Sequence, residues 1–416
     1  MTEEYTLGRI KKYTDKILNG EKVDSFRFVF PRNKEESVGW KYDFWDMQPV
    51  TKQGTKVGVP RIIDSKVSSN NTVGLAPRPY EWYECVPDEK VITFLNKYFV
   101  EMIDAAKDKI VQCFDIDYLK WYIGSTGKLL CAKTVVNGVE HIGAVCVLCF
   151  RTMQLYTKKY KVCETKYMCI HPKLREKGLC EAMITEICRI AHNNDAIVGM
   201  FFTERYISVP VCKVYRFDRP INYKKMLDMG FIVLENSKEL DIAINEYKPL
   251  KSGSIGVPMG EKDVDTVMEL LNKYQDKYNI YEIYTRESFV ETFMNNPVVK
   301  SFVIKKDDTV VDFFSYVKTK HKLNRNKDKE EYLLVGQMFM YTSNTITPLM
   351  IFKSAIIEAA NRDKCDMFTC TDTMENLDVL YDNVNKFIEK SYVWMNFYNW
   401  ECPEISCQQL GYACLL

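Results

Sequence analysis

The sequence predicts an α/β protein made of two related halves, in which a mixed sheet is flanked by helices. Apolar runs, partly alternating with polar residues, indicate strands at 133–136, 141–150 and 162–170. A helix follows at 179–191, where apolar residues recur every fourth position. Beyond residue 251 the order of helix, strands, helix and strand returns, and this favours an internal repeat.

The rest of the first half carries fewer local signals. Residues 1–24 are polar and rich in lysine, so we expect them to form an arm outside the folded domains. The stretch 43–74 has no sustained period and is predicted to be a long wrapping segment. Helical spacing appears at 91–107. A further helix at 223–229, closed by a glycine, should lead into a strand at 231–234.

The second half begins after a stretch rich in glycine and serine, so we place the two domains at 25–250 and 251–416. Thr347 and Pro348 fit the N-cap and the first position of a helix. The predicted elements of this half, in chain order, are a helix at 261–278, strands at 301–304 and 310–317, a solvated charged loop at 318–331, a strand at 333–341 and a helix at 348–362.

Composition limits the classes of function. The formal net charge of +1 provides no general attraction to nucleic acid or to an anionic membrane surface. The 15 cysteines form no metal-like grouping with the 4 histidines, so we expect reduced thiols, no metal site and no disulfide framework. The longest apolar run, Ile142 to Phe150, is too short to span a bilayer, and the N-terminus does not read as a signal peptide. These features predict a cytoplasmic protein without a transmembrane segment.

The first feature with chemical meaning is a basic turn between a strand and a helix. Lys173, Arg175 and Lys177 supply cationic donors, and the glycine at 178 opens a helix whose N-terminal N–H groups favour a pyrophosphate. The spacing of Arg175, Gly178 and Cys180 also resembles the coenzyme A turn of the GNAT acyltransferase superfamily. The alternative is an ordinary solvated turn closed by a glycine.

Three longer segments resemble the glycylpeptide N-myristoyltransferase family. Residues 42–50 read Tyr-Asp-Phe-Trp-Asp-Met-Gln-Pro-Val, similar to the family's aromatic-Phe-Trp-Asp-Thr-Gln-Pro-Val. Residues 164–175 read Glu-Thr-Lys-Tyr-Met-Cys-Ile-His-Pro-Lys-Leu-Arg, similar to Glu-Ile-Asn-Phe-Leu-Cys-Val-His-Lys-Lys-Leu-Arg. Residues 219–226 read Arg-Pro-Ile-Asn-Tyr-Lys-Lys-Met, similar to Arg-Pro-Leu-Asn-Trp-Lys-Lys-Leu. Shorter matches follow in the family's order at 312–316, 347–349, 374–376 and 398–403.

This resemblance implies two fused GNAT-like halves related by a pseudo-twofold axis. It also implies a monomeric acyltransferase that takes myristoyl-CoA as the acyl donor, bound mainly by the first half. The acceptor would be a protein or peptide with an N-terminal glycine, bound mainly by the second half. The N-terminal amine has a reference pKa of about 8 and must lose a proton before it attacks, so such an enzyme needs a base.

The resemblance further assigns roles to individual residues. Main-chain N–H groups of Tyr167 and Met168, on a bulged strand, would form the oxyanion hole, which requires no particular side chain. The terminal carboxylate at Leu416 would be the base, because burial raises its pKa toward that task. Residues expected at the acyl-CoA site are Tyr42, Phe44, Trp45, Met168, Cys169, Ile170, Lys173, Arg175, Lys177, Gly178, Leu179 and Cys180. Candidates for the amine pocket are Thr203, Asn222, Tyr341 and Asp372.

Departures from the family pattern gather at the same places. Glu176 and Glu181 put carboxylates beside the expected pyrophosphate. Asp218 replaces the histidine that precedes Arg-Pro-Leu-Asn in the family, which predicts a different peptide preference. Five residues follow Gly411 where the family has four, and one extra residue in an extended tail adds about 3 Å.

Two other functions stay open from the residues alone. One is an acyltransferase with a different acyl-chain length, or with a lysine side chain as the acceptor. The other is a catalytically weak relative that binds acyl-CoA or a peptide. The candidate residues also have structural interpretations, in which the aromatic pair pins a loop and the apolar tail docks against the core.

Overall fold

The computed structural model describes residues 31–40, 43–65, 79–99, 110–233, 240–248, 253–294, 296–323, 331–381 and 386–415. The expected arm at 1–24, together with Tyr42 and Leu416, lies outside these ranges. No helix in the described ranges is both long and apolar enough to span a membrane.

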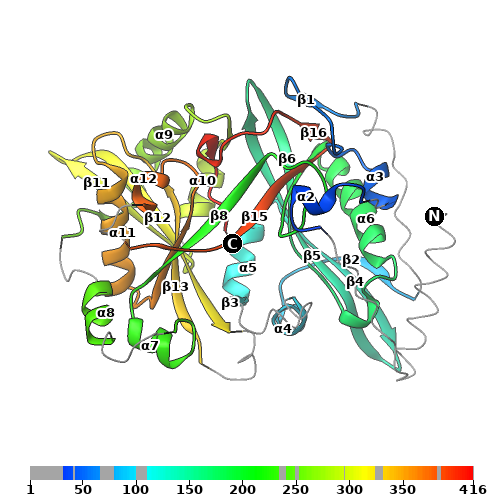
Figure 1. Ribbon diagram of the computed structural model, residues 1–416, viewed down its shortest axis with the longest axis horizontal. Coiled ribbons are helices and arrows are strands. Elements are labelled where there is room, and N and C mark those ends of the chain that lie inside the picture. The colour runs from blue at the N-terminus through cyan, green and yellow to red at the C-terminus, as the bar shows by residue number, and fades with distance from the viewer. Residues whose placement is uncertain are drawn as a thin grey trace.

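One continuous mixed sheet runs through both halves of the molecule (Figure 1). In spatial order its main strands are β4, β5, β6, β7, β15, β8, β14, β13, β12 and β11. Their bounds are Lys128–Val136, Val139–Leu155, Lys158–Ile170, Val198–Thr203, Ile388–Tyr398, Cys212–Pro220, Met367–Thr371, Leu333–Tyr341, Thr309–Leu323 and Val299–Lys306, in the same order. The sequence of strands is symmetrical about the central pair of β15 and β8.

The two halves exchange one strand each at this centre. Strand β8 belongs to the first half in sequence but pairs with β14 of the second, with Asp218 opposite Thr369. Strand β15 belongs to the second half but pairs with β7 of the first, with Trp394 opposite Thr203. The exchanged strands also pair with each other, and Figure 1 shows them side by side through the middle of the molecule. Each half therefore completes its sheet with a strand from the other.

In both halves a parallel pair of strands is hydrogen-bonded only along its first part. Strands β6 and β7 run paired up to Thr165 opposite Phe201, although β6 continues to Ile170. Strands β13 and β14 run paired up to Gln337 opposite Thr369, although β13 continues to its end at residue 341. The sheet is therefore open between the parallel strands at two equivalent places.

A β-bulge lies at the equivalent position of each half. In the first half, Tyr167 and Met168 of β6 lie opposite the single residue Cys146 of β5. In the second half, two residues of β13, at 339 and 340, lie opposite Ser315 of β12. Together with the strand order and the open parallel pairs, these bulges confirm the predicted internal repeat.

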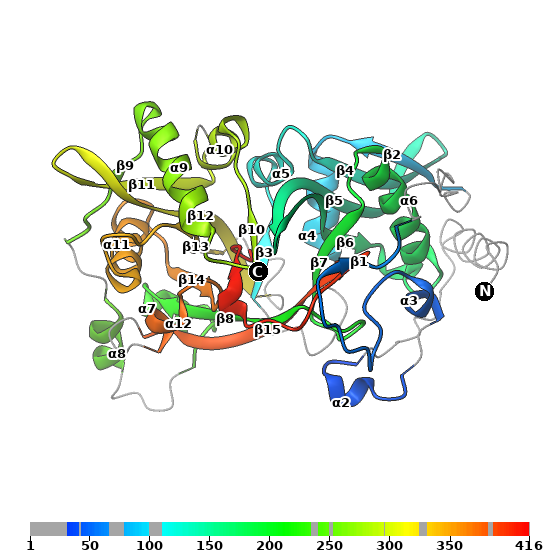
Figure 2. The same cartoon turned by 90° about the horizontal axis from the view of Figure 1, so that it is seen from above.

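Helices cover both faces of the sheet in each half, which confirms the predicted fold class. Helix α6 (Leu179–Asn193) packs on one face of the first half, and α4 (Glu89–Tyr98) and α5 (Ile116–Ile123) pack on the other. Helix α11 (Pro348–Asn361) takes the position equivalent to α6. Figure 2 shows α6 and α11 on the two outer flanks, with the C-terminal tail between the halves.

The remaining elements are short or lie at the edges of the sheet. They are α2 (Lys34–Ser37), α3 (Asp43–Met47), β1 (Arg61–Ile62), β2 (Glu81–Cys85), β3 (Ile110–Cys113), α7 (Tyr223–Asp228), α8 (Leu240–Tyr247), β9 (Val257–Pro258), α9 (Val264–Gln275), β10 (Ile280–Glu282), α10 (Arg286–Phe293), α12 (Leu377–Leu380), β16 (Trp400–Glu401) and β17 (Leu410–Gly411), with 3-10 turns at Pro172–Leu174, Glu261–Asp263 and Cys407–Gln409.

Most local expectations are confirmed. Strand β13 has the predicted bounds, and Thr347 caps α11 by accepting a hydrogen bond from the amide of Met350. Gly230 ends α7 with a positive φ of 78°, and Phe231 N donates to Met226 O across it. This is the hydrogen bond of a Schellman motif, which a glycine at that place predicts.

Three expectations about element bounds are wrong. Residues 231–233 form no strand, because Phe231 packs instead into a small apolar cluster beside Met226. Residues 318–323, predicted to begin a charged loop, belong to β12, which continues to Leu323 by pairing with β13 and β3; the rest of that predicted loop up to residue 330 lies outside the described residues. The helix predicted at 91–107 ends at Tyr98, and its expected continuation at 100–107 lies outside the described residues.

The strand exchange gives a prediction about the two domains proposed at 25–250 and 251–416. Expressed separately, each should fail to fold, because its sheet lacks one inner strand and exposes an unpaired edge. Expressed together, they should assemble. Far-ultraviolet circular dichroism with urea titration measures this. A single half that unfolds cooperatively on its own would contradict the prediction.

Candidate functional site

The bulge on β6 has an unusual backbone. Tyr167 adopts φ of +52°, a left-handed conformation that bulky residues rarely take. Neither Tyr167 nor Met168 has a single partner opposite it on β5, since both face Cys146. The extra residue of a bulge leaves the hydrogen-bond ladder, so main-chain groups here are turned out of the sheet.

Aromatic packing holds this conformation in place. The Tyr167 ring lies 4.8 Å from that of Phe114 and 5.6 Å from that of Tyr122. Its hydroxyl group is 2.5 Å from the hydroxyl of Tyr118. Burial raises the pKa of both hydroxyls well above the ordinary value, so they stay neutral. The aromatic cage therefore adds no charge to the site.

The two bulges differ in what faces them. In the second half, Ser315 Oγ accepts from the amide of Met340 (3.1 Å) and donates to its carbonyl oxygen (2.9 Å). In the first half, the equivalent residue is Cys146, whose thiol lies 3.6 Å from the carbonyl oxygen of Lys166. A thiol is a weak acceptor, whereas a hydroxyl accepts strongly. Ser315 thus binds the main-chain N–H group of the second bulge. In the first bulge, the Cys146 thiol is a poor acceptor for the equivalent N–H groups.

The C-terminal tail is buried between the two halves. Its main chain is held by side chains from three elements. Gln275 Nε2 of α9 donates to the Gly411 carbonyl oxygen (2.9 Å), and Gln337 Nε2 of β13 donates to that of Cys414 (2.9 Å). Lys166 Nζ of β6 donates to the Leu415 carbonyl oxygen. The described tail therefore ends beside the residue that precedes the bulge.

A buried ion cluster lies next to this tail. Arg151 Nε donates to Glu164 (2.7 Å), and its Nη1 donates to Glu282 (3.2 Å). Its guanidinium carbon also lies 5.8 Å from the ring centre of Tyr412 in the tail. Burial works to raise the pKa of Glu164, but Arg151 and Lys166 bring it below the ordinary value. Burial prevails at Glu282 and raises its pKa.

Lys166 completes the cluster. Its Nζ lies 4.9 Å from the ring centre of Tyr122 and 5.2 Å from that of Tyr167. Burial lowers its pKa to about 8, and Glu164 opposes that shift. Two cations and two carboxylates thus balance one another inside the protein.

The basic turn before α6 is arranged differently from a solvated turn. Gly178 has φ of +88° and caps α6 without a side-chain hydrogen bond, which leaves the helix N-terminus to other acceptors. Arg175 donates to the carbonyl oxygens of Ile170 (2.9 Å) and Tyr98 (2.7 Å), so it ties the turn to β6 and α4. Lys173 is exposed and residue 177, also a lysine, is buried.

Other residues expected at the acyl-CoA site lie along the same line. Leu179 is fully buried at the start of α6, and the thiol of Cys180 lies 3.6 Å from Met168 Sδ. Cys169 and Ile170 are buried in the last part of β6. The structure therefore brings the bulge, the turn and the helix start together.

The aromatic pair lies at the opening between β6 and β7. Trp45 stacks on Phe201 with ring centres 5.8 Å apart, and Phe44 meets Trp45 edge-on at 5.5 Å. Phe201 is the last β7 residue paired with β6. Trp45 also borders a cavity of about 340 Å³, which Lys52 and Tyr206 line as well.

Two of the four amine-pocket candidates lie at neighbouring strand ends. Tyr341 ends β13, and its hydroxyl donates to Asn376 Oδ1 (2.9 Å). Asp372 follows β14 directly and accepts from the amide of Tyr215 (2.9 Å). Burial raises the pKa of Asp372. Both side chains are thus buried and hydrogen-bonded near the place where β13 and β14 part.

The other two candidates lie on β7 and at the start of α7. Thr203 ends β7, and its hydroxyl accepts from the amide of Arg205 (3.0 Å). Asn222 caps α7 and donates to Asp366 Oδ1 (3.1 Å), at the end of β14 opposite to Asp372. Six residues of strand span about 20 Å. The structure therefore does not bring Asn222 together with the other candidates.

The sheet face toward the tail is polar in the second half. Gln337 contacts the tail, while its neighbour Gly336 faces Phe368 and Ala359 under α11. The register places Thr369 beside Gln337 and Asp218 beside Thr369. Residues opposite each other in paired strands share a face. Asp218 therefore lies on the face of the tail.

Asp218 and His321 are among the side chains of this face that keep a buried polar atom without a partner among the described residues. Asp218 is 1% exposed, and its Oδ1 accepts from Arg216 Nε (2.9 Å) while Oδ2 has no described partner. His321 is 4% exposed, and its Nε2 lies 2.9 Å from Thr319 Oγ1 while Nδ1 has no described partner. Burial lowers the pKa of His321. Buried polar groups of this kind indicate a polar ligand or water.

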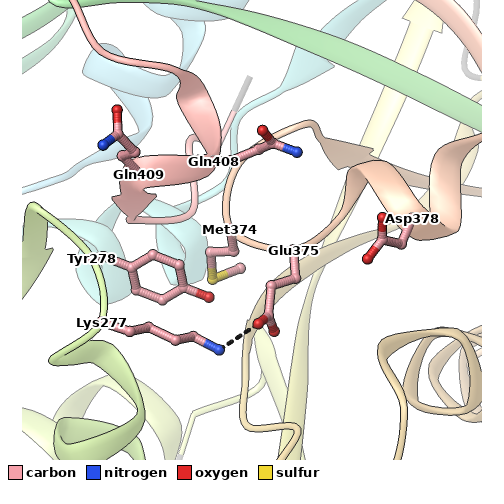
Figure 3. A pocket seen from close by; sticks show the side chains of 7 residues that line it. All are labelled: Lys277, Tyr278, Met374, Glu375, Asp378, Gln408 and Gln409. Carbon is pink, nitrogen blue, oxygen red and sulfur yellow. Dashed lines mark hydrogen bonds and ion pairs between the residues drawn. The ribbon is translucent and has the colours of Figure 1, made fainter.

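A separate pocket of about 270 Å³ lies where the tail begins (Figure 3). Lys277 pairs with Glu375 (2.6 Å) at its wall, and Met374 N donates to the Leu410 carbonyl oxygen beside it. The other lining residues are Tyr278, Asp378, Gln408 and Gln409. Across the part of the chain that the structure describes, no group of three or more metal-binding side chains occurs.

Sequence reasoning did not single out several residues that the structure places around the tail. They are Arg151, Lys166, Gln275, Glu282 and Gln337. The available signal was a charge within or beside an apolar strand, as at Arg151 and Lys166. The glutamines had none, because nothing in the local sequence marks their distant partners.

The ion cluster gives a stability prediction. Replacing Arg151 with methionine should lower the free energy of unfolding by about 3–5 kcal/mol, since two buried carboxylates lose their cation. The matched control is Arg362→Met, which removes an exposed partner of Glu358 and should cost less than about 1 kcal/mol. Urea denaturation at pH 7 compares the two. Equal losses in the free energy of unfolding would show that the buried cluster contributes no more to stability than the exposed pair.

Comparisons with known proteins show which family the chain belongs to. The family described as myristoyl-CoA:protein N-myristoyltransferase matches with its N-terminal domain at residues 64–214 and with its C-terminal domain at 228–410. The glycylpeptide N-tetradecanoyltransferase of Plasmodium falciparum is 26% identical, over 92% of this chain and 96% of that protein. The protein of the same name from Candida albicans is 29% identical, over 82% and 81%.

A solved structure shares the fold. Saccharomyces cerevisiae N-myristoyltransferase with bound myristoyl-CoA superposes with a TM-score of 0.81 at 21% identity, covering 90% of this chain and 99% of that chain. The two family domains follow each other along the chain and together span strands of both halves of the sheet. The chain is therefore an acyltransferase and a member of the myristoyl-CoA:protein N-myristoyltransferase family.

Proposed function

We propose that this protein transfers a myristoyl group from myristoyl-CoA to the N-terminal glycine amine of protein substrates. The observation that carries the proposal is the meeting of two features at one point. The bulge at Tyr167 and Met168 lies where β6 has parted from β7, and the described part of the buried tail ends beside it at Leu415. Main-chain donors and the last described residue of the chain, Leu415, are thus close together at one opening in the sheet.

The oxyanion hole is proposed at the main-chain N–H groups of Tyr167 and Met168. Support comes from the bulge and from Cys146, which competes weakly for these donors. A preorganised N–H donor aimed at the tetrahedral oxyanion is worth about 3–4 kcal/mol in the transition state. The second half would lack this activity, because Ser315 already binds the equivalent amide.

The acyl-CoA is proposed to bind along the opening between β6 and β7. Phe44 and Trp45 would wall the coenzyme side, which the stacking on Phe201 supports. The N-terminus of α6 at Gly178 would receive the pyrophosphate, with exposed Lys173 as a cationic donor. Arg175 would act indirectly, since it holds the turn against two carbonyl oxygens.

The base is proposed to be the terminal carboxylate at Leu416. Burial raises the pKa of a carboxylate, and the carboxylate is then a stronger base. The burial of the tail up to Leu415 supports this proposal. Tyr341, Asp372 and Thr203 remain proposed neighbours of the substrate amine, and Asn222 is not among them because it lies at the far end of β14.

The peptide is proposed to lie on the polar sheet face of the second half. Its support includes two buried atoms that have no partner among the described residues, Asp218 Oδ2 and His321 Nδ1. An extended peptide carries the N–H and C=O groups that such a face requires. Asp218 in place of the family's histidine favours substrates with a donor side chain there.

We also propose that the protein works as a monomer in the cytoplasm. All 15 cysteines are free thiols, as in proteins of reducing compartments. Both halves of the proposed site belong to one chain.

The transfer activity is tested by incubating the protein with myristoyl-CoA and peptides that begin with glycine. Free CoA should appear only when the peptide amine is unblocked, because the amine is the nucleophile. The matched control is the same peptide with an acetylated N-terminus, carrying an internal lysine. CoA release with the acetylated peptide would indicate lysine acylation, and tight acyl-CoA binding without any release would refute the transferase proposal.

The base is tested by removing Leu416. Deletion moves the carboxylate back by one residue, about 3.3 Å in an extended chain, so kcat should fall strongly. Leu416→Ala keeps the carboxylate in place and should retain most of the activity. A deletion variant as active as Leu416→Ala would show that the base lies elsewhere.

A further inference from the structure

Lys166 differs from the family pattern, and it contacts the C-terminal tail, which also differs from that pattern. It stands where the family segment Glu-Ile-Asn-Phe-Leu-Cys has its asparagine. Its Nζ donates to the carbonyl oxygen of Leu415, within the tail that carries one residue more than the family pattern. The unusual lysine and the unusual tail therefore meet.

The position of Lys166 suits a role in holding the tail. Lys166 directly precedes the bulge at Tyr167. It also directly follows Thr165, the last β6 residue that pairs with β7. Its side chain shares a face with that of Glu164, two residues earlier on the strand. Its Nζ passes over the rings of Tyr122 and Tyr167 before it reaches the tail.

We propose that Lys166 is a positioning residue whose ammonium group clamps the C-terminal tail against the bulge of β6, so that acyl transfer requires its positive charge. The inference rests on the proposed transferase function. It assigns no chemistry to the lysine itself, since the proposed base is the terminal carboxylate. Its charge would fix the tail from which that carboxylate acts.

The surrounding charges explain why an ammonium is needed. Arg151 pairs with both Glu164 and Glu282. Its single positive charge therefore leaves one of the two negative charges without compensation. Lys166 balances the charge of the two glutamates, which an asparagine amide cannot do. Loss of its proton would leave a net negative charge beside a reaction that develops negative charge itself.

The groups around Lys166 determine the pH dependence. They are Glu164 on β6, Cys149 and Arg151 on β5, Tyr122 on α5, Tyr167 at the bulge and Cys414 in the tail. Burial raises the pKa of both thiols and both phenols. Arg151 stays charged, because its carboxylate partners raise its pKa although burial opposes them. Lys166, with a pKa of about 8, is thus the group among these that titrates close to neutrality.

The expected dependence of kcat on pH follows from the requirement for protonated Lys166. The clamp needs the protonated lysine, so kcat should fall as pH rises above about 8. The substrate amine must be deprotonated, so kcat should first rise with pH. The native protein should therefore show a maximum, with the alkaline fall belonging to Lys166.

The test compares Lys166→Met, Lys166→Arg and the exposed control Lys159→Met on the same strand. Lys166→Met should lose about 100-fold in kcat, the cost of a misplaced catalytic group, with little change in KM for myristoyl-CoA. Lys166→Arg keeps the charge, so it should retain most of the activity and lose the alkaline fall. Lys159→Met should behave as the native protein. An inactive but folded Lys166→Arg variant, or one with an unchanged alkaline fall, would overturn the proposal.

A second measurement separates this inference from the transferase function. Hydrogen exchange at the amides of Cys414 and Leu415 reports the clamp whether or not the protein transfers an acyl group. These amides should exchange faster in Lys166→Met than in the native protein, and faster in the native protein above pH 8 after correction for intrinsic rates. Unchanged exchange would refute the clamp, whereas absent CoA release alone would refute only the transferase function.

Discussion

The pairing of β8 with β15 at the centre of the sheet governs the rest of the molecule. Tyr215 lies opposite Tyr392 there, and each of the two strands continues into the sheet of the opposite half. Backbone hydrogen bonds therefore fix how the halves sit against each other, which side-chain packing alone would fix less strictly. Everything found between the halves, including the buried tail, depends on this frame.

Within this frame, the two copies of the internal repeat differ in the side chain that faces the bulge. Both halves keep the open parallel pair and the bulge, but Ser315 uses the main-chain donor of its own bulge, whereas Cys146 competes little. The tail is then directed to the first bulge by side chains from both halves, Gln275 and Gln337 from the second and Lys166 from the first. The bulge of the first half thus keeps its main-chain donors available, while side chains of the second half help to hold the tail beside it.

Local sequence patterns predicted most elements well and failed where pairing decides the outcome. Strand β13 and the cap at Thr347 follow from alternation and capping chemistry, which act between near neighbours. Residues 318–323 are charged and solvated by their pattern, yet they form strand because β13 and β3 supply backbone partners. Phe231 is apolar and lacks a partner strand, so it packs beside Met226 instead.

By itself, the sequence determined the order of helices and strands, the repeat, the basic turn and the family segments, because these depend on residue type and short spacing. Tertiary structure alone decided which strands are exchanged, that Asn222 lies apart from Asp372, and that Lys166 meets Leu415. Lys166 and Leu415 are 249 positions apart in the chain. Contacts over such distances arise from the path of the backbone, and no local pattern records that path.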